Sequence, residues 1–198
     1  MSSEASGRLD DLMRSVAAGG THKLVPLERW NPPDCGEIDI RIDVEGVWHH
    51  AGTPIRRLAL MKLFASIMRR EDERYVLVTP VEKLGIQVED APFLAVDMAV
   101  ETAGEGEGET LVFRTNLDEA VRCNAAHPLR FDARPDSDEL RPYIYVRRGL
   151  WARLTRSVFY ELVERAQERE IDGERVLGIA SGGAFFPIVP AAALDGNR

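Results

Sequence analysis

The sequence predicts an α+β protein made of two related subdomains with mostly antiparallel sheets. The first reason is that many short segments alternate apolar and polar residues, as half-buried strands do, while two longer stretches show the spacing of an amphipathic helix. The second reason is an internal repeat: "GVWHHAGTPIRRLALMKLFASIMRRE" from Gly46 resembles "GLWARLTRSVFYELVERAQERE" from Gly149. A repeated supersecondary unit predicts a duplicated subdomain.

The N-terminal segment, residues 1–34, is expected to be a short helix followed by an extended arm. Residues 6–18 place apolar side chains on one face of a helix that Ser6 can cap. Three prolines in "LVPLERWNPPDCGE" exclude a helix there and weaken any central strand. Trp30 is expected to anchor this arm by burying its ring.

The first subdomain is expected to cover residues 35–91 and to begin with a hairpin. Isoleucines alternate with charged residues over 38–43, which predicts a strand with one exposed face. Glu45 and Gly46 predict a turn, and a return strand follows over residues 47–50.

A helix is expected next, over residues 54–70, followed by two more strands. Thr53 can cap this helix, and Pro54 would occupy the first helical position, where proline is tolerated. The predicted buried stripe consists of Leu60, Leu63, Phe64 and Ile67. "YVLVTP" (75–80) and "LGIQVED" (84–90) are predicted to be strands.

The second subdomain is expected to cover residues 92–198. "FLAVDMAVET" and "TLVFRTN" predict a hairpin, and its loop "AGEGEGE" is predicted to be exposed because it combines glycine with glutamate. "PLRFDA", "PYIYV" and "LWARL" predict further strands, and residues 155–169 predict the second helix. The chain then continues in short apolar pieces that glycine and proline interrupt.

The repeat makes a specific structural prediction. Its unit would be a hairpin, a helix and a strand, so residues 46–79 should superpose on 149–180 with the same strand order. Trp48 and Trp151 occupy equivalent places and should each be buried against the helix of their own unit. The alternative is that two amphipathic helices align by chance.

Composition limits the classes of function. The chain has 198 residues and a net charge of −8, which argues against general binding to nucleic acid or to anionic membrane surfaces. No apolar segment of 18 residues exists, so no membrane-spanning helix is expected. Cys35 and Cys123 lie far apart and predict free thiols, as in a cytoplasmic protein.

Motifs for catalysis, cofactors and metals are absent from the sequence. It contains no GxSxG elbow, P-loop or GxGxxG fingerprint, which favours a non-enzymatic protein without a cofactor. His49 and His50 are neighbours in a predicted strand and would point to opposite faces, so they cannot share one metal ion. His22 and His127 are isolated, and no metal site is expected. The glycine-rich "SGGAFFP" (181–187) predicts a loop.

An arginine-rich stretch supplies the first candidate site. Residues 141–160 contain five arginines and no acidic residue, and the candidate ligand-binding residues among them are Arg147, Arg153 and Arg156. Arginine at a helix N-terminus opposes the helix dipole, whereas an anion bound there would be stabilised by both. The alternative is that carboxylates elsewhere in the chain neutralise these arginines.

Two strand ends supply the other candidates, because binding groups accumulate where strands give way to loops. Thr79, Glu82 and Lys83 follow the strand at 75–80, and Thr115 and Asn116 end the strand "FRTN". The alternatives are a surface turn in the first case and a polar strand end in the second.

The motifs "ERWNPPDCGEIDIRID", "GTPIRRLALMKLF", "YVLVTPVEKLGIQVEDAPF" and "RPYIYVRRGLWARLTRSVFYELVE" resemble the uncharacterised bacterial domain-of-unknown-function family DUF1285. The resemblance extends from about Leu27 to about Ile179, and "AGEGEGE" departs from it. It implies a duplicated α+β core whose later part is similar to pleckstrin-homology folds. It also implies a nucleotide-like ligand at the domain interface and a role in signal transduction, without assigned catalytic residues.

Three functions are compatible with these observations. The first is a cytoplasmic binding or regulatory protein that holds an anionic, nucleotide-like ligand between its subdomains. The second is a protein-interaction module whose arginines dock an acidic partner. The third is an enzyme with an unrecognised site. A screen of nucleotides and other anions would distinguish them.

Overall fold

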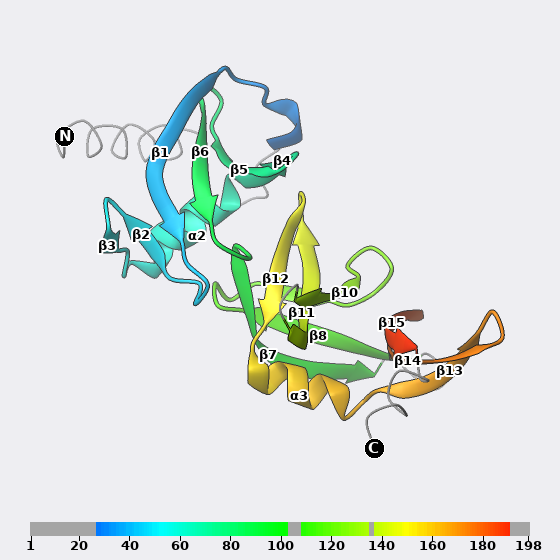
Figure 1. The fold of residues 1–198 in the computed structure, drawn as a ribbon. Coiled ribbons are helices and arrows are strands. Elements are labelled where there is room, and N and C mark those ends of the chain that lie inside the picture. Colours follow the sequence, from blue (N-terminus) through cyan, green and yellow to red (C-terminus); the bar gives the residue numbers. More distant parts are fainter. Residues whose placement is uncertain (1–26, 103–107, 135–136, 191–198) are drawn as a thin grey trace. The chain divides into compact units, whose positions relative to one another are not determined.

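The computed structural model describes residues 27–102, 108–134 and 137–190 (Figure 1). The helix expected over residues 6–18 and residues 103–107 of the expected loop lie outside this part of the chain. Within it, no helix is long and apolar enough to cross a membrane.

The chain divides into two compact units. The first extends up to Pro92 and includes Arg148–Leu150, and the second consists of Phe93–Arg147 together with the chain from Trp151 onward. In the described ranges both units are mostly sheet, each with one α-helix, so this part of the chain contains less helix than the sequence predicts.

The first unit holds a six-stranded mixed sheet in the order β3-β2-β1-β6-β5-β4. After the short 3-10 helix η1 (Leu27–Arg29), its strands are β1 (Asp34–Ile42), β2 (Trp48–His50), β3 (Thr53–Pro54), β4 (Met68–Glu71), β5 (Arg74–Val78) and β6 (Lys83–Val88). β1 and β6 are parallel neighbours at the centre, and the other neighbours are antiparallel. The predicted alternation in β1 is confirmed, because Ile38, Ile40 and Ile42 are buried while Asp39 is exposed.

Helix α2 (Leu58–Ser66) is shorter than the predicted helix at both ends. Thr53 and Pro54, which were expected to begin it, form strand β3 because they pair with β2. At the other end, Met68–Glu71 forms strand β4 and pairs with β5. The chain reverses between them at Asp72, whose φ of 51° lies in the left-handed region that tight hairpin turns require.

The core of the first unit is built around Trp48. Its side chain is 0% exposed, and its ring stacks on Phe64 of α2 with a centroid distance of 6.1 Å. Phe64 and Ile67 of the predicted helical stripe are buried, whereas Leu60 and Leu63 are only partly so. The prediction that Trp48 packs on the helix of its own unit is therefore confirmed.

The second unit contains another six-stranded mixed sheet, in the order β10-β11-β12-β7-β8-β9. Its strands are β7 (Phe93–Thr102), β8 (Glu109–Thr115), β9 (Ala120–Arg122), β10 (Leu129–Arg134), β11 (Ser137–Arg147) and β12 (Leu150–Leu154). The predicted hairpin is confirmed as β7 and β8, which pair antiparallel. β12 lies parallel to β7 and joins that hairpin to the rest of the sheet.

A small three-stranded sheet follows helix α3 (Arg156–Val163). Its strands are β13 (Gln167–Ile171), β14 (Glu174–Ser181) and β15 (Ala184–Pro190). The prediction of a helix up to residue 169 is wrong, because β13 pairs antiparallel with β14. The turn between them has positive φ at Asp172 (53°) and Gly173 (83°), as in a type I′ hairpin.

The two copies of the repeat share the order strand, helix, hairpin, but they do not share one sheet arrangement. Strands β4 and β5 belong to the same sheet as β2, whereas β13 and β14 form a sheet separate from β12. The predicted common strand order is therefore wrong. Trp151 was expected to be buried against the helix of its own unit, but it is only partly buried. Its ring lies edge-on to Tyr145 at a centroid distance of 5.2 Å, and the Arg130 guanidinium lies 4.4 Å from its centre.

Candidate functional site

A pocket in the second unit collects three of the five arginines in the arginine-rich stretch. It has a volume of about 210 Å³ and is lined by four charged residues, Glu139, Arg141, Arg153 and Arg156. Its remaining lining residues are Leu140, Pro142, Leu154 and Phe159. We call it the arginine pocket.

Each arginine comes from a different secondary-structure element. Arg141 lies in β11 opposite Asp132 of β10, and Arg153 lies in β12 opposite Leu94 of β7. Arg156 is the first residue of α3. Because the sheet fixes β11 and β12 and the helix follows β12 directly, the three side chains converge without depending on a long loop.

The N-terminus of α3 contributes to the same pocket. The Thr155 amide donates to Ala95 O at 3.0 Å, which attaches the beginning of the helix to β7. Among the described residues, the Thr155 hydroxyl makes no capping bond to the helix backbone; it lies 3.2 Å from Ser157 Oγ. Arg156 donates from Nε to Tyr160 Oη at 2.8 Å, and this contact raises the pKa of Arg156.

The described lining is electropositive. Three guanidinium groups face one carboxylate, that of Glu139. Glu139, Arg141 and Arg153 each have a further interaction inside the protein. The arrangement still suits an anion, since planar guanidinium groups bind phosphate and carboxylate oxygens through paired N–H donors.

The other two arginines of the stretch serve the structure. Arg147 forms an ion pair with Glu119, and its guanidinium lies 5.4 Å from the centre of the Phe93 ring. In the first unit, Arg148 Nε lies 2.8 Å from Glu28 Oε1. Neither residue lines the arginine pocket. Arg147 was a candidate ligand-binding residue, and it has here the carboxylate partner that the alternative described.

Two further candidates, Thr79 and Thr115, stabilise turns through their hydroxyl groups. Both side chains are fully buried. The Thr79 hydroxyl accepts from the amides of Val81 (3.3 Å) and Glu82 (3.1 Å). The Thr115 hydroxyl accepts in the same way, from the amides of residues 117 (3.3 Å) and 119 (3.1 Å). Asn116 has a similar role, because its Oδ1 accepts from the amide of residue 94 at 3.1 Å.

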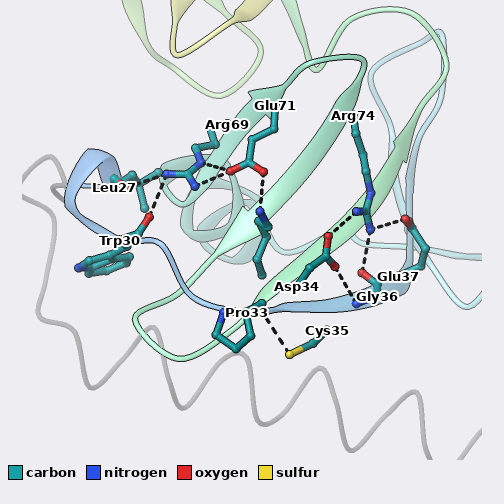
Figure 2. A network of polar contacts seen from close by, with 11 residues as sticks. Leu27, Trp30, Pro33, Asp34, Cys35, Gly36, Glu37, Arg69, Glu71 and Arg74 are labelled. Atoms are coloured by element: carbon teal, nitrogen blue, oxygen red, sulfur yellow. Dashed lines mark hydrogen bonds and ion pairs between the residues drawn. The ribbon is translucent and has the colours of Figure 1, made fainter.

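Lys83 belongs to a network of polar contacts in the first unit. Its ammonium group lies 2.6 Å from Glu71 Oε2, and Glu71 Oε1 accepts from Arg69 Nε at 2.8 Å. Arg69 in turn donates to the carbonyl groups of Leu27 (2.8 Å) and Trp30 (3.2 Å), as Figure 2 shows. The hydrogen bond from Lys83, followed by the one from Arg69, holds the pKa of Glu71 below its usual value against the opposing effect of burial.

Arg74 organises the other end of this network. It forms ion pairs of 2.6 Å with both Asp34 and Glu37 and donates to Gly36 O at 3.1 Å (Figure 2). The network ties the beginning of β1 to β5 across β6, so its charges are used within the protein. Lys83 and the residues of the arginine pocket belong to different units.

The histidines and cysteines differ in their surroundings in the part of the chain that the structure describes. No group of three potential metal ligands occurs there. His49 and His50 are partly exposed strand neighbours, and His49 Nε2 lies 2.9 Å from Asp43 Oδ2. Burial raises the pKa of the Cys123 thiol to about 12, which keeps it protonated and unreactive. Cys35 is an exposed free thiol.

Together these features define a mostly β protein of two units, the second of which carries an arginine-lined pocket. Family models for the N-terminal and the C-terminal domain of DUF1285, described as a domain and a protein of unknown function, match residues 25–91 and 92–188. The chain therefore belongs to the DUF1285 family.

Two solved structures of the family are similar to this chain. A DUF1285 family protein from Silicibacter pomeroyi DSS-3 is 41% identical, with a TM-score of 0.80 over 93% of this chain and 97% of that one. Another from Shewanella baltica OS155 is 33% identical, with a TM-score of 0.51 over 64% of this chain and 91% of that one. A search of curated proteins found no match.

Proposed function

We propose that this protein binds a small phosphate-bearing ligand in the arginine pocket and acts as a binding or regulatory protein. The observation that supports this most is the convergence of Arg141, Arg153 and Arg156 from two strands and a helix N-terminus on one concavity. A phosphate there would interact with guanidinium groups and with the positive end of the α3 dipole.

The size of the pocket limits what can enter it. At about 210 Å³ it is smaller than the range of roughly 300–1,000 Å³ that encloses a whole drug-sized ligand. A phosphate group fits, while the rest of a nucleotide-like ligand would remain outside. Tyr160, one turn after Arg156 and 56% exposed, offers an aromatic face close to the rim.

The lining favours binding over catalysis. Among the described lining residues, Glu139 carries the one carboxylate. Its neighbours are arginines, which remain protonated, and apolar side chains. Such a lining holds and orients an anion, and its described residues include no serine, threonine, cysteine, lysine or histidine.

Isothermal titration calorimetry of the full chain tests this function. Inorganic phosphate, adenosine monophosphate and adenosine would be titrated at low and at high salt. We expect both phosphate-bearing probes to bind more tightly at low salt, and adenosine alone not to bind. Arg156→Ala should weaken binding by about 1.5–3 kcal/mol, the scale of a charge-assisted hydrogen bond.

Arg114→Ala is the matched control. Arg114 is an exposed arginine of the same unit that pairs with Asp97 at 3.0 Å and does not line the arginine pocket. It should leave binding unchanged. Absence of heat with every phosphate-bearing probe, or an equal effect of both substitutions, would contradict the proposed function and favour docking of an acidic partner or purely internal ion pairing.

A further inference from the structure

A second concavity in the second unit has no role in the proposed function. It has a volume of about 290 Å³ and lies where the beginning of β8 meets β13 and the turn between β14 and β15. Its polar wall is formed by Arg165, Gln167 and Arg169, and its apolar lining includes Leu111, Ala180 and Ala184. We call it the β13 pocket.

Small residues of β14 leave room for the Phe185 ring beside this pocket. Gly178 lies opposite Gln167 of β13, and Ala180 lies opposite Phe185 of β15. A Cβ atom on Gly178 would lie 2.5 Å from a carbon of the Phe185 ring. The ring therefore lies directly against the backbone of Gly178, in space that any larger residue would occupy.

Phe185 in turn orients Arg169. The guanidinium carbon of Arg169 lies 4.7 Å from the centre of the Phe185 ring. Stacking of this kind fixes the plane of the guanidinium and leaves its N–H donors at the edge. Within the described ranges, no carboxylate is within ion-pair distance of Arg169, so those donors have no anionic partner there.

The second arginine of the pocket is already balanced. Arg165 Nη1 lies 3.4 Å from Glu109 Oε2, and Glu109 itself lines the pocket. Ser181 is also committed, because its hydroxyl donates to Cys123 O at 2.8 Å and accepts from the Leu111 amide at 2.9 Å. One guanidinium thus remains for a ligand, beside a carboxylate that would repel a second negative charge.

We propose that the β13 pocket binds the carboxylate of a small aliphatic monocarboxylic acid. Arg169 would hold the carboxylate through two parallel N–H donors, the bidentate geometry in which arginine binds carboxylates best. The Gln167 amide lies on the same wall, and Leu111 and Ala180 would contact the aliphatic chain. A singly charged ligand distinguishes this site from the arginine pocket, where three arginines face one glutamate.

Nuclear magnetic resonance titration of the full chain with butanoate tests the proposal. The readout is the backbone amide shift of Gln167 and Gly183, both of which line the pocket. We expect saturable shifts with butanoate, none with the neutral analogue butanamide, and a weaker response to inorganic phosphate. Arg169→Met keeps an apolar contact with Phe185 but removes the donors, and it should weaken butanoate binding about tenfold or more.

Two control variants locate the effect. Arg175→Met removes an exposed arginine of β14 that pairs with Glu168 at 3.4 Å and lies outside the pocket. Arg156→Ala alters only the arginine pocket. Both should leave butanoate binding unchanged, so the two binding sites can fail independently.

Should Arg169→Met not fold, Arg169→Lys provides the second test, because it keeps the charge but loses the paired donors. It should weaken binding severalfold. The proposal is overturned if butanoate gives no saturable shift in the unsubstituted protein. It is equally overturned if butanamide binds as tightly, or if the folded Arg169 variants bind butanoate normally.

Discussion

The Glu71 carboxylate forms an ion pair with the ammonium group of Lys83 at 2.6 Å and also accepts a hydrogen bond from Arg69. Lys83 is only 15% exposed, and its charge is matched inside the first unit. The lysine that the sequence offered as a ligand contact therefore has a structural partner. The strength of this pairing should be visible in the stability of the protein.

Glu71→Gln should destabilise the protein by about 1–3 kcal/mol at neutral pH, because two cations lose their charged acceptor. The folded state lowers the pKa of Glu71, so its contribution to stability is complete above the usual carboxyl pKa and is lost as the pH falls through the folded value. The difference in the free energy of unfolding between the native protein and the variant should therefore become smaller in acid. Urea denaturation at several pH values measures it.

Glu73→Gln is the control for this experiment. Glu73 pairs with Arg70 at 3.3 Å, but its side chain is 96% exposed. An exposed ion pair contributes little, so the substitution should change stability by less than about 0.5 kcal/mol at any pH. Equal behaviour of the two variants would show that the Glu71 network does not stabilise the fold.

The two tryptophans of the repeat should differ. Trp48→Ala should cost about 3–5 kcal/mol, because the ring is fully buried against Phe64. Trp151→Ala should cost only about 1–2 kcal/mol, since its ring is partly exposed and contacts Arg130 and Tyr145. Denaturant titration gives both values, and a cost for Trp151 equal to that of Trp48 would contradict the partial exposure described here.

The buried threonines should be needed for their hydroxyl groups. Thr79→Val keeps the shape of the side chain but leaves the amides of Val81 and Glu82 without their acceptor, so it should cost about 1–3 kcal/mol. Thr115→Val should behave in the same way. Thr79→Ser retains the hydroxyl and should lose only about 0.8 kcal/mol for the missing methyl group. If serine were as damaging as valine, packing rather than hydrogen bonding would hold the turn.

Gly178→Ala should destabilise the small sheet of the second unit by about 1–3 kcal/mol, because its Cβ would collide with the Phe185 ring. Gly108→Ala is the matched control, since nothing lies within 4 Å of a Cβ at that position. Thermal unfolding compares the two variants. A neutral Gly178→Ala would mean that Phe185 can move away, and the orientation of Arg169 would then be weaker than the geometry indicates.

Strands with one buried face could be predicted from the sequence, and exposed strands could not. Strand β1 could be predicted because every second residue is apolar and buried, as Ile38, Ile40 and Ile42 are. Strand β13 has no such signal, since all five of its residues, Gln167–Ile171, are exposed and its composition suits a helix surface. The Asp172-Gly173 turn was the available sign of the hairpin.

The sequence predicted that arginines form the candidate site, but not which arginines line the pocket. Local sequence singled out Arg147, Arg153 and Arg156, yet Arg141, six residues before Arg147 in β11, lines the pocket and Arg147 does not. The β13 pocket could not be predicted, because it is lined by β8 together with β13, β14 and β15, which lie far from β8 in the sequence. The prediction of a loop at "SGGAFFP" holds only for Gly182 and Gly183, because Ser181 ends β14 and Ala184 begins β15.

Strand β13 also bears on association between chains. In the described sheet it has β14 as its neighbour on one side, so its other backbone edge is a template on which a foreign strand could assemble. Four of its five residues are polar or charged, and Glu168, Arg169 and Glu170 follow one another. Such a run discourages edge-to-edge aggregation, since an incoming strand would have to bring matching charges or leave these unpaired. The polar residues that deprive β13 of a strand-like apolar alternation thus also act as gatekeepers against amyloid-like stacking.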